Sequence, residues 1–556
     1  MLAAIMRVCV TTVCLFSGVI ACVSDSPIVE TVTTEAGTPT SEALTMGEVP
    51  TTGETGTGVT SSTGDTGTSD TGDTGEAGLE YAHGVRLTRV TATQAVQTDI
   101  VKDGAPVAGE DYAVRLISRR KTVLRANWSL HADFVPRELI GRLTIWTPEG
   151  ETAVDDFKVL VDGESNDGDL FKTFSWQLTP EFVRPGLEYR VAAYEVDPAM
   201  ASGEISDPPP ILPLAGRGTL QVADDPMEIK VRLIPIKHLF EGDECMPEIS
   251  DVDVDDMVEW MEMHNAVERA IIEVGEPLEY TKSISEAQDG FVPVLDEVAI
   301  RRAADDPPDN LYYYALITSC DGYPPGLLGQ AIAITEGSDP GFAYQRIASG
   351  RYLGSGAAAR ETFVHEIGHA QGRYHIQCSG GEAGFDPSYP HSNGRIGVWG
   401  YGVHDTALRS PTGYRDYMTY CAPAFVSDFG WELTYDYIKE LTSWDYAGPP
   451  VDPDDGPLLR GTLYSDGGSR WWTTHGSVPP VAAGAELEFE AGGQVITAPA
   501  AVAQIPHGTA RSVTVRLPPQ WSAVTGLRLR MDGEVRADAP RSAVREHHVV
   551  DWNAGP

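Results

Sequence analysis

Residues 365–375 read HEIGHAQGRYH, and this short pattern dictates a local geometry that the rest of the chain must accommodate. On a helix of 3.6 residues per turn, His365 and His369 lie one turn apart and project from the same face. Their neutral imidazole nitrogens can bind one metal ion at about 2.0–2.1 Å. Glu366 lies about 100° further round the helix, so its carboxylate can reach a water on the metal without displacing a ligand.

The chain must reverse direction after this helix. Glycine tolerates the left-handed backbone conformation, so Gly372 is expected to end the helix and turn the chain back. This reversal lets His375 supply a third ligand, whereas a continuing helix would carry it past the metal. Three protein ligands leave the fourth position of a tetrahedral zinc ion open for water. The pattern therefore predicts a catalytic zinc site with His365, His369 and His375 as ligands.

The pattern HExxHxxGxxH resembles the signature of the metzincin clan of zinc endopeptidases, which pair it with a downstream methionine turn. Residues 416–421, DYMTYC, match such a turn. The resemblance implies that Met418 packs beneath the histidines without binding zinc. It also implies that Tyr420 approaches the zinc or stabilises an oxyanion as a second catalytic residue, with ordinary packing as the alternative.

The resemblance carries an expected activity. Zinc held by three histidines lowers the pKa of its bound water towards about 7, and Glu366 accepts the proton and passes it to the leaving amine. We therefore expect a secreted or surface-tethered zinc endopeptidase that acts on extracellular proteins or glycoproteins. Trp399 and Tyr401 lie before the methionine turn, in the segment that shapes the specificity pocket of metzincins, with simple packing as the alternative. A surface adhesin with a structural zinc site is the rival function, and a zinc amidase is a third.

Cysteine usage is consistent with an oxidising compartment. Four of the seven cysteines lie beyond the first 22 residues, namely Cys245, Cys320, Cys378 and Cys421. An even set suggests two disulfides, and four cysteines allow three pairings. The metzincin resemblance implies that the zinc motif and the methionine turn meet at one metal. Cys378 follows His375 by three residues, and Cys421 follows Met418 by three. This favours the pairs Cys378–Cys421 and Cys245–Cys320.

The N-terminal part has two distinct compositions. Residues 1–22 are expected to be a lipoprotein-type signal peptide with a short apolar run, ending in the lipobox-like VIAC at Cys22. An ordinary signal peptide is the alternative. Residues 23–79 are rich in Thr, Gly, Ser and Asp and predict a disordered tether, with a glycosylated stalk as the alternative. We expect an outer-membrane or cell-surface lipoprotein, or an extracellular protein, with the lipid as its only membrane contact.

A chain of 556 residues is long enough for several domains. Residues 80–225 show short strand-like runs that predict an immunoglobulin-like β-sandwich, serving as a spacer or a substrate-binding module. Residues 226–446 carry the motif and are expected to form an α+β metzincin catalytic domain, with a twisted mixed sheet and helices that include Val252–Val274 and Val294–Ala303. Residues 447–556 predict a C-terminal β-domain without catalytic residues.

The formal net charge of −41 argues against nucleic-acid and anionic-membrane partners, since a basic patch would have to overcome the field of the whole molecule. Such a charge is typical of a solvated secreted surface, and acidic Ca²⁺ sites are the alternative. The aspartates at 251, 253, 255 and 256 do not follow the spacing of an EF-hand loop. They favour the N-terminus of a helix, where the macrodipole stabilises negative charge. A monomer is expected.

Overall fold

The computed structural model describes residues 79–547, apart from residues 202, 336, 355, 380–383 and 482–483. The described residues from Tyr81 onward belong to one compact unit. The predicted signal peptide, the predicted lipidation residue Cys22 and nearly all of the predicted tether lie outside the described residues. Among the described helices, none combines the length and the apolar character needed to cross a membrane.

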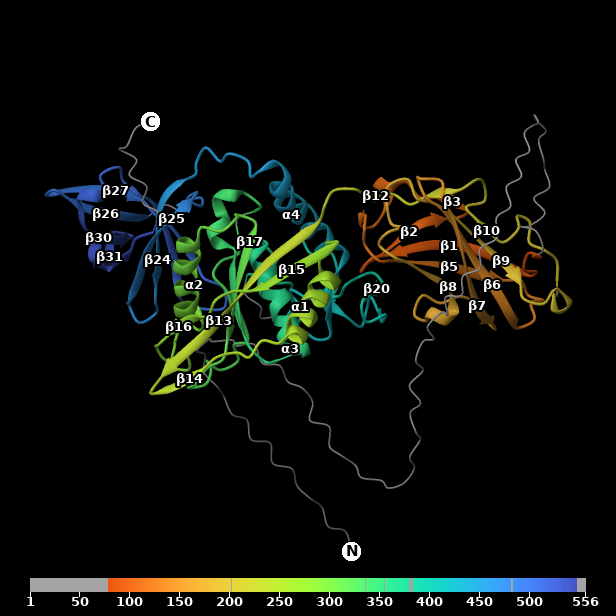
Figure 1. Cartoon of the computed structure of the whole chain (residues 1–556), viewed down its shortest axis with the longest axis horizontal. Helices are drawn as coiled ribbons and strands as arrows, with labels where there is room; N and C mark the ends of the chain where they lie inside the picture. The colour runs from red at the N-terminus through yellow and green to blue at the C-terminus, as the bar shows by residue number, and fades with distance from the viewer. Residues whose placement is uncertain are drawn as a thin grey trace, which may run out of the picture. The chain divides into compact units, whose positions relative to one another are not determined.

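Two antiparallel sheets stack at the N-terminal end of the described chain (Figure 1). The first has the order β3-β2-β1-β5-β8 and consists of β1 (Val85–Thr93), β2 (Gln97–Lys102), β3 (Ala105–Pro106), β5 (Thr122–Leu130) and β8 (Phe174–Leu178). The second has the order β10-β9-β6-β7, with β11 beside β9, and consists of β6 (Arg137–Trp146), β7 (Thr152–Val161), β9 (Glu188–Glu195), β10 (Ile211–Leu212) and β11 (Gly218–Thr219). A shared apolar core that includes Trp128, Phe174 and Trp176 fills the space between them. Alternating inward side chains are what such a sandwich requires.

The sheet that carries the histidine motif is mixed and has the order β14-β13-β17-β19-β18. Its strands are β13 (Glu228–Phe240), β14 (Asp243–Cys245), β15 (Arg269–Val274), β16 (Leu278–Tyr280), β17 (Leu311–Ile317), β18 (Gly329–Ala331) and β19 (Ile347–Arg351). β13 pairs in parallel with β15, β16 and β17, and β17 pairs in parallel with β19. β18 runs antiparallel to β19 and ends the sheet.

Helices cover both faces of this sheet (Figure 1). They are α1 (Asp251–His264), α2 (Val292–Asp305), α3 (Ala357–Ala370) and α4 (Asp428–Ala447). Alternate residues of β17 divide between two cores: Tyr312 and Tyr314 pack with residues of α1, α3 and α4, whereas Tyr313 and Ala315 pack with residues of α2. The period of two along a buried strand explains this division.

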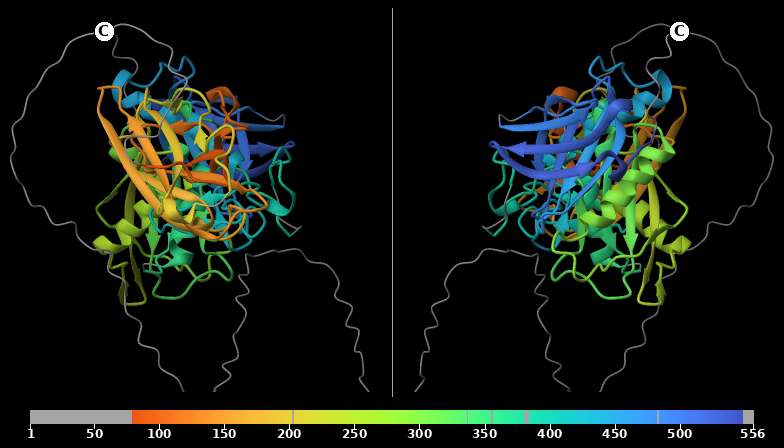
Figure 2. Two further views of the ribbon diagram at one scale, coloured as in Figure 1. Left: turned by 90° about the vertical axis from the view of Figure 1, so that its right-hand side faces the viewer. Right: turned by 90° about the vertical axis from the view of Figure 1, so that its left-hand side faces the viewer.

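The C-terminal part forms two further sheets, which Figure 2 shows from two sides. The first has the order β28-β29-β24-β25-β32 and consists of β24 (Gly456–Leu463), β25 (Ser469–Gly476), β28 (Ala501–Gln504), β29 (Arg511–Arg516) and β32 (Val544–Arg545). The second has the order β27-β26-β30-β31 and consists of β26 (Ala485–Ala491), β27 (Gln494–Pro499), β30 (Val524–Met531) and β31 (Glu534–Pro540). β25 packs beside α2, so the C-terminal sheets and the motif-bearing sheet share an interface.

Short two-stranded pairs complete the described strands. They are β4 (Leu116–Ile117) with β12 (Val222–Ala223), β20 (Gly400–Tyr401) with β21 (Leu408–Arg409), and β22 (Arg415–Asp416) with β23 (Ala424–Phe425).

The predicted α+β metzincin fold class is wrong. Among the described residues, strand predominates, with 39% in strands and 19% in helices, and the strands form many small sheets. One cause is visible at the segment predicted as a single helix, Val252–Val274. The helix ends at His264, and Arg269–Val274 form strand β15, because Ile271 and Ile272 pair in parallel with β13. Tertiary pairing of β-branched residues has overridden an apparent helical spacing.

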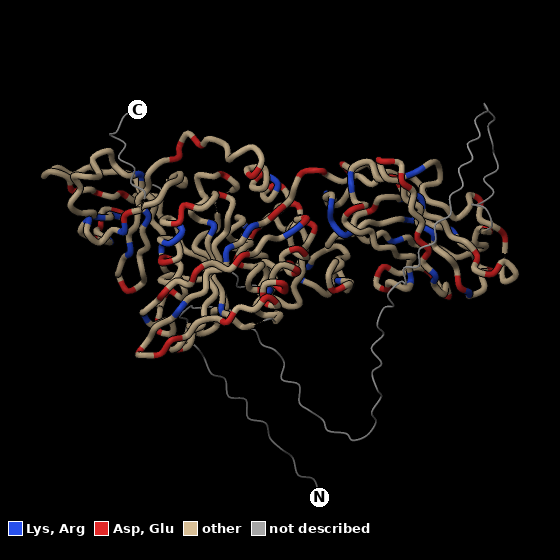
Figure 3. Tube along the Cα trace, in the orientation of Figure 1, with Lys and Arg blue, Asp and Glu red and all other residues tan. Residues whose placement is uncertain are grey.

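Acidic residues are spread along the whole described trace (Figure 3). The aspartates that begin α1 act as helix N-terminal residues: Ser250 caps the helix, and Asp253 completes a capping box with it. Asp256 forms an ion pair with Arg360 of α3, with an N–O distance of 2.7 Å. These contacts agree with the helix N-terminus predicted for this cluster.

Candidate metal centre

Helix α3 positions the first three residues of the candidate site. Its side chains Phe363, Val364 and Ile367 are buried in the core, which fixes the rotation of the helix about its axis. The 3.6-residue period then places His365 and His369 on one side, with their ring centroids 4.9 Å apart.

The predicted reversal after α3 is present. Gly372 has φ 80°, in the left-handed region, and its N–H donates to the carbonyl of His369. The N–H of Arg373 donates to the carbonyl of Gly368, which closes the helix end. A Cβ added to Gly372 would lie 2.9 Å from the carbonyl oxygen of Thr335, so glycine is required both by conformation and by space.

The reversal brings His375 to the two helix histidines. The Nε2 atoms of His369 and His375 are 3.1 Å apart. Two nitrogens bound to one tetrahedral zinc at 2.0–2.1 Å would be about 3.3 Å apart, so this spacing suits a common ion. The three predicted ligands are thus together and largely buried, with 9%, 0% and 6% exposure for His365, His369 and His375.

Backbone carbonyls orient two of these rings. His365 Nδ1 lies 2.8 Å from the carbonyl oxygen of Tyr417, and His369 Nδ1 lies 2.7 Å from that of Arg373. Each Nδ1–H is therefore the donor, and each Nε2 lone pair faces its neighbours, as metal-binding histidines require. His365 Nε2 and Glu366 Oε2 are buried and have no hydrogen-bond partner. Such orphaned polar atoms fit a metal ion and a reacting water.

Burial sets the protonation states of the cluster. It lowers the pKa of His365 to about 3, helped by the nearby His375 and Arg373, and it lowers the pKa of His369 well below the usual range. Both rings are therefore neutral and able to bind a cation. Burial raises the pKa of Glu366 well above its usual range.

An edge strand lies directly beside Glu366. A Cβ added to Gly329 of β18 would lie 2.7 Å from Glu366 Cγ and 2.9 Å from Oε1. The missing side chain thus lets β18 approach the carboxylate closely.

Residues 416–421, predicted to be a methionine turn, lie against helix α3 beside the candidate centre. Met418 is fully buried, and a Cβ added to Gly368 of α3 would lie 2.4 Å from its Sδ. The N–H of Met418 donates to Asp416, and its carbonyl accepts the N–H of Ile376. Arg373 forms a buried ion pair with Asp416. The turn and the chain reversal therefore hold each other in place.

Both predicted disulfides are confirmed. Cys378–Cys421 joins the exit of the histidine motif to the methionine turn, and Cys245–Cys320 joins β14 to the loop after β17. These bonds are consistent with an extracellular protein.

The tyrosine of the turn reaches the cluster. The Tyr420 hydroxyl lies 2.9 Å from His375 Nε2, while the residue remains 39% exposed. Tyr420 therefore lies at the edge of the centre.

The two specificity-loop candidates contact the N-terminal sandwich. The N–H of Tyr401 donates to the carbonyl of Ala95, and the carbonyl of Trp399 accepts the N–H of Gln97. A Cβ added to Gly168 would lie 3.1 Å from the ring of Trp399. These contacts give no support to a role in the substrate pocket.

The structure adds a fourth histidine that the sequence did not reveal. His507 lies between β28 and β29, in the C-terminal part for which no catalytic residue was predicted. Its Nε2 is 3.3 Å from His369 Nε2, and one ring nitrogen from each of the four histidines lies within 4.8 Å of all the others. The His507 side chain is only 7% exposed. No local pattern marks this residue, because its position depends on packing between distant segments.

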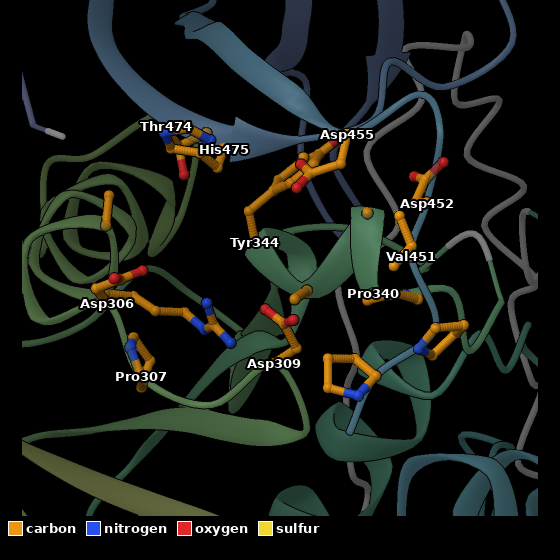
Figure 4. A pocket seen from close by; sticks show the side chains of 17 residues that line it. Asp306, Pro307, Asp309, Pro340, Tyr344, Val451, Asp452, Asp455, Thr474 and His475 are labelled. Carbon is orange, nitrogen blue, oxygen red and sulfur yellow. The ribbon is translucent and has the colours of Figure 1, made fainter. Parts of the chain in front are cut away.

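Figure 4 shows a different pocket, with a volume of about 310 Å³. Its lining includes Asp306, Asp309, Asp452, Asp455 and His475 and none of the four clustered histidines. It is therefore a feature separate from the candidate metal centre.

No family model and no curated protein matches the chain. Among solved structures, a β-glucosidase from Kluyveromyces marxianus in complex with glucose is similar at 8% identity with a TM-score of 0.09. The alignment covers 84% of this chain, which spans about half, 53%, of the length of the glucosidase. A similarity this low carries no argument about fold or activity.

Proposed function

We propose that the chain is a zinc-dependent endopeptidase with a metzincin-type active-site segment. The observation that carries the proposal is Glu366, a carboxylate that is 3% exposed and has an unpartnered Oε2 beside three clustered histidines, two of which are oriented by backbone carbonyls. Burying a carboxylate oxygen without a hydrogen-bond partner is costly, and a purely structural metal site has no use for one.

The chain's own residues divide the chemistry among them. His365, His369 and His375 would hold the ion through Nε2. Zinc bound there would polarise the scissile carbonyl and activate a water molecule. Glu366 accepts the proton of the attacking water and returns it to the leaving amine, a role that suits a carboxyl group with a raised pKa. The Tyr420 hydroxyl, which lies 2.9 Å from His375 Nε2, would donate to the developing oxyanion.

The expected substrates are extracellular proteins or glycoproteins, and the exported, lipid-anchored location remains part of this proposal. The two disulfides support an oxidising compartment. The N-terminal sandwich would serve as a spacer or a substrate-binding module.

The test compares Glu366→Gln with Glu361→Gln, a matched change on the same helix. Both are made in the natural chain and in the His507→Ala chain, since His507 lies at the centre. We expect Glu366→Gln to lower cleavage of a peptide library about 10²–10⁴-fold while zinc content stays unchanged. Glu361→Gln should cleave normally. Undiminished cleavage by zinc-loaded Glu366→Gln would refute the proposed mechanism.

A binding protein with a structural metal site is the second candidate, and His507 is the observation that favours it. Four histidines complete a tetrahedral shell, as structural zinc sites do. If this second candidate is correct, the β-sheets at either end of the chain would bind the partner. Neither Glu366→Gln nor Glu361→Gln, in the natural chain or in the His507→Ala chain, would then cleave any peptide.

A further inference from the structure

The hairpin that joins β28 to β29 reaches the histidine cluster from the C-terminal part of the chain. Its tip, residues 505–510, places His507 Nε2 3.3 Å from His369 Nε2 and 3.9 Å from Glu366 Oε1. The other ring nitrogen, Nδ1, lies 3.1 Å from the Tyr420 hydroxyl. One side chain thus contacts a ligand, the proposed base and the proposed oxyanion donor.

The hairpin is held at this position by contacts with the motif-bearing part. Gln330 of β18 donates to the carbonyl of Pro506 over 2.7 Å, and Thr509 donates to Asp289 over 2.6 Å. Ile505 and Ala510 are buried against Val292 at the start of α2. A side chain carried by an anchored hairpin is pre-organised for binding.

The same hairpin lies at the edge of the sheet next to Glu366. β18 ends the sheet, and an extended peptide can pair with such an edge. The carbonyl of Pro506 accepts a hydrogen bond from Gln330, in the middle of β18. The hairpin would therefore obstruct a peptide that approaches Glu366 along this edge.

We propose that the hairpin at residues 505–510 is a built-in inhibitory segment, with His507 as a fourth protein ligand that takes the position a substrate or water needs. The inference rests on the proposed endopeptidase function. It also explains why a four-histidine shell is found together with a buried Glu366 whose Oε2 has no hydrogen-bond partner, a residue that a permanently closed site would not need.

The experiment compares the full chain with His507→Ala and with His475→Ala, a histidine of the same C-terminal part that lines the separate pocket. Each chain is loaded with Co²⁺ for visible absorption and with Zn²⁺ for cleavage of a denatured protein. In His507→Ala a nitrogen ligand is exchanged for water, so the Co²⁺ spectrum should change. If the natural site is open about 1% of the time, cleavage should rise about 100-fold. His475→Ala should match the natural chain in both measurements.

A second variant leaves all four histidines in place. Thr509→Val removes the hydrogen bond to Asp289 and so loosens the hairpin. It should raise cleavage by less than His507→Ala does, and its Co²⁺ spectrum should still contain the bands of the natural chain.

The outcomes separate this inference from the proposed function. An unchanged Co²⁺ spectrum in His507→Ala would show that His507 is not a ligand. A changed spectrum with cleavage no faster than that of an active natural chain would show that the hairpin does not block the site. A changed spectrum with no cleavage by any chain would overturn the proposed endopeptidase function and the inhibitory role together.

Discussion

Replacing Gly372 by alanine should separate the third histidine from the other two. The residue has φ 80°, and the left-handed conformation costs an alanine about 1–2 kcal/mol. The new Cβ would also lie 2.9 Å from the Thr335 carbonyl oxygen, a backbone atom that cannot move aside cheaply. Overpacking of this kind adds about 1–3 kcal/mol, so we expect a total loss of about 2–5 kcal/mol.

The structure offers a closely matched control for this change. Gly337 has φ 81°, but a Cβ there would have no atom within 4 Å, so Gly337→Ala has the conformational cost without the collision. Guanidinium unfolding of both variants measures the difference, and competition with a chelator measures zinc affinity. Gly372→Ala should be the less stable variant and should bind zinc more weakly. Equal unfolding midpoints together with equal zinc affinities would refute the reasoning.

Three further changes test the surroundings of the centre. Gly368→Ala drives a Cβ to within 2.4 Å of Met418 Sδ and should lower the free energy of unfolding by about 1–3 kcal/mol in chemical denaturation. Removing the Cys378–Cys421 bond, whose cysteines are 43 residues apart, should cost up to about 4 kcal/mol and weaken zinc binding in chelator competition; unchanged values would contradict the supporting role of the disulfide. Burial raises the pKa of Asp296 to about 6 from 3.8, so this carboxyl group favours the folded state when protonated, and its contribution falls by about 3 kcal/mol as pH rises from about 4 to 6. Unfolding of Asp296→Asn at a series of pH values should lack that decrease.

The local features of the centre were predictable because they follow from backbone geometry over a few residues. The helical period places His365 and His369 together, and the left-handed Gly372 returns the chain to His375. The disulfide Cys378–Cys421 was expected for a different reason, namely the metzincin resemblance, which implies that the two motifs meet at one metal.

Features that depend on distant packing were not predictable. His507 is 138 residues from His369, and only the docking of Ile505 and Ala510 on Val292 brings it to the cluster. The predicted fold class is wrong for a related reason. Residues 269–274 continue an apparent helical spacing, but they form strand β15 because β13 is available as a parallel partner. The contacts of Trp399 with the sandwich likewise depend on distant packing, and its place before residues 416–421 does not predict them.

The most direct test of the proposed endopeptidase activity is the digestion of a peptide library by the zinc-loaded His507→Ala chain. The digestion is repeated with the additional change Glu366→Gln, and mass spectrometry detects the cleaved peptides. We expect many cleaved peptides with His507→Ala and a loss of about 10²–10⁴-fold when Glu366→Gln is added at equal zinc content. Equal cleavage by the two chains, or none by either, would contradict it.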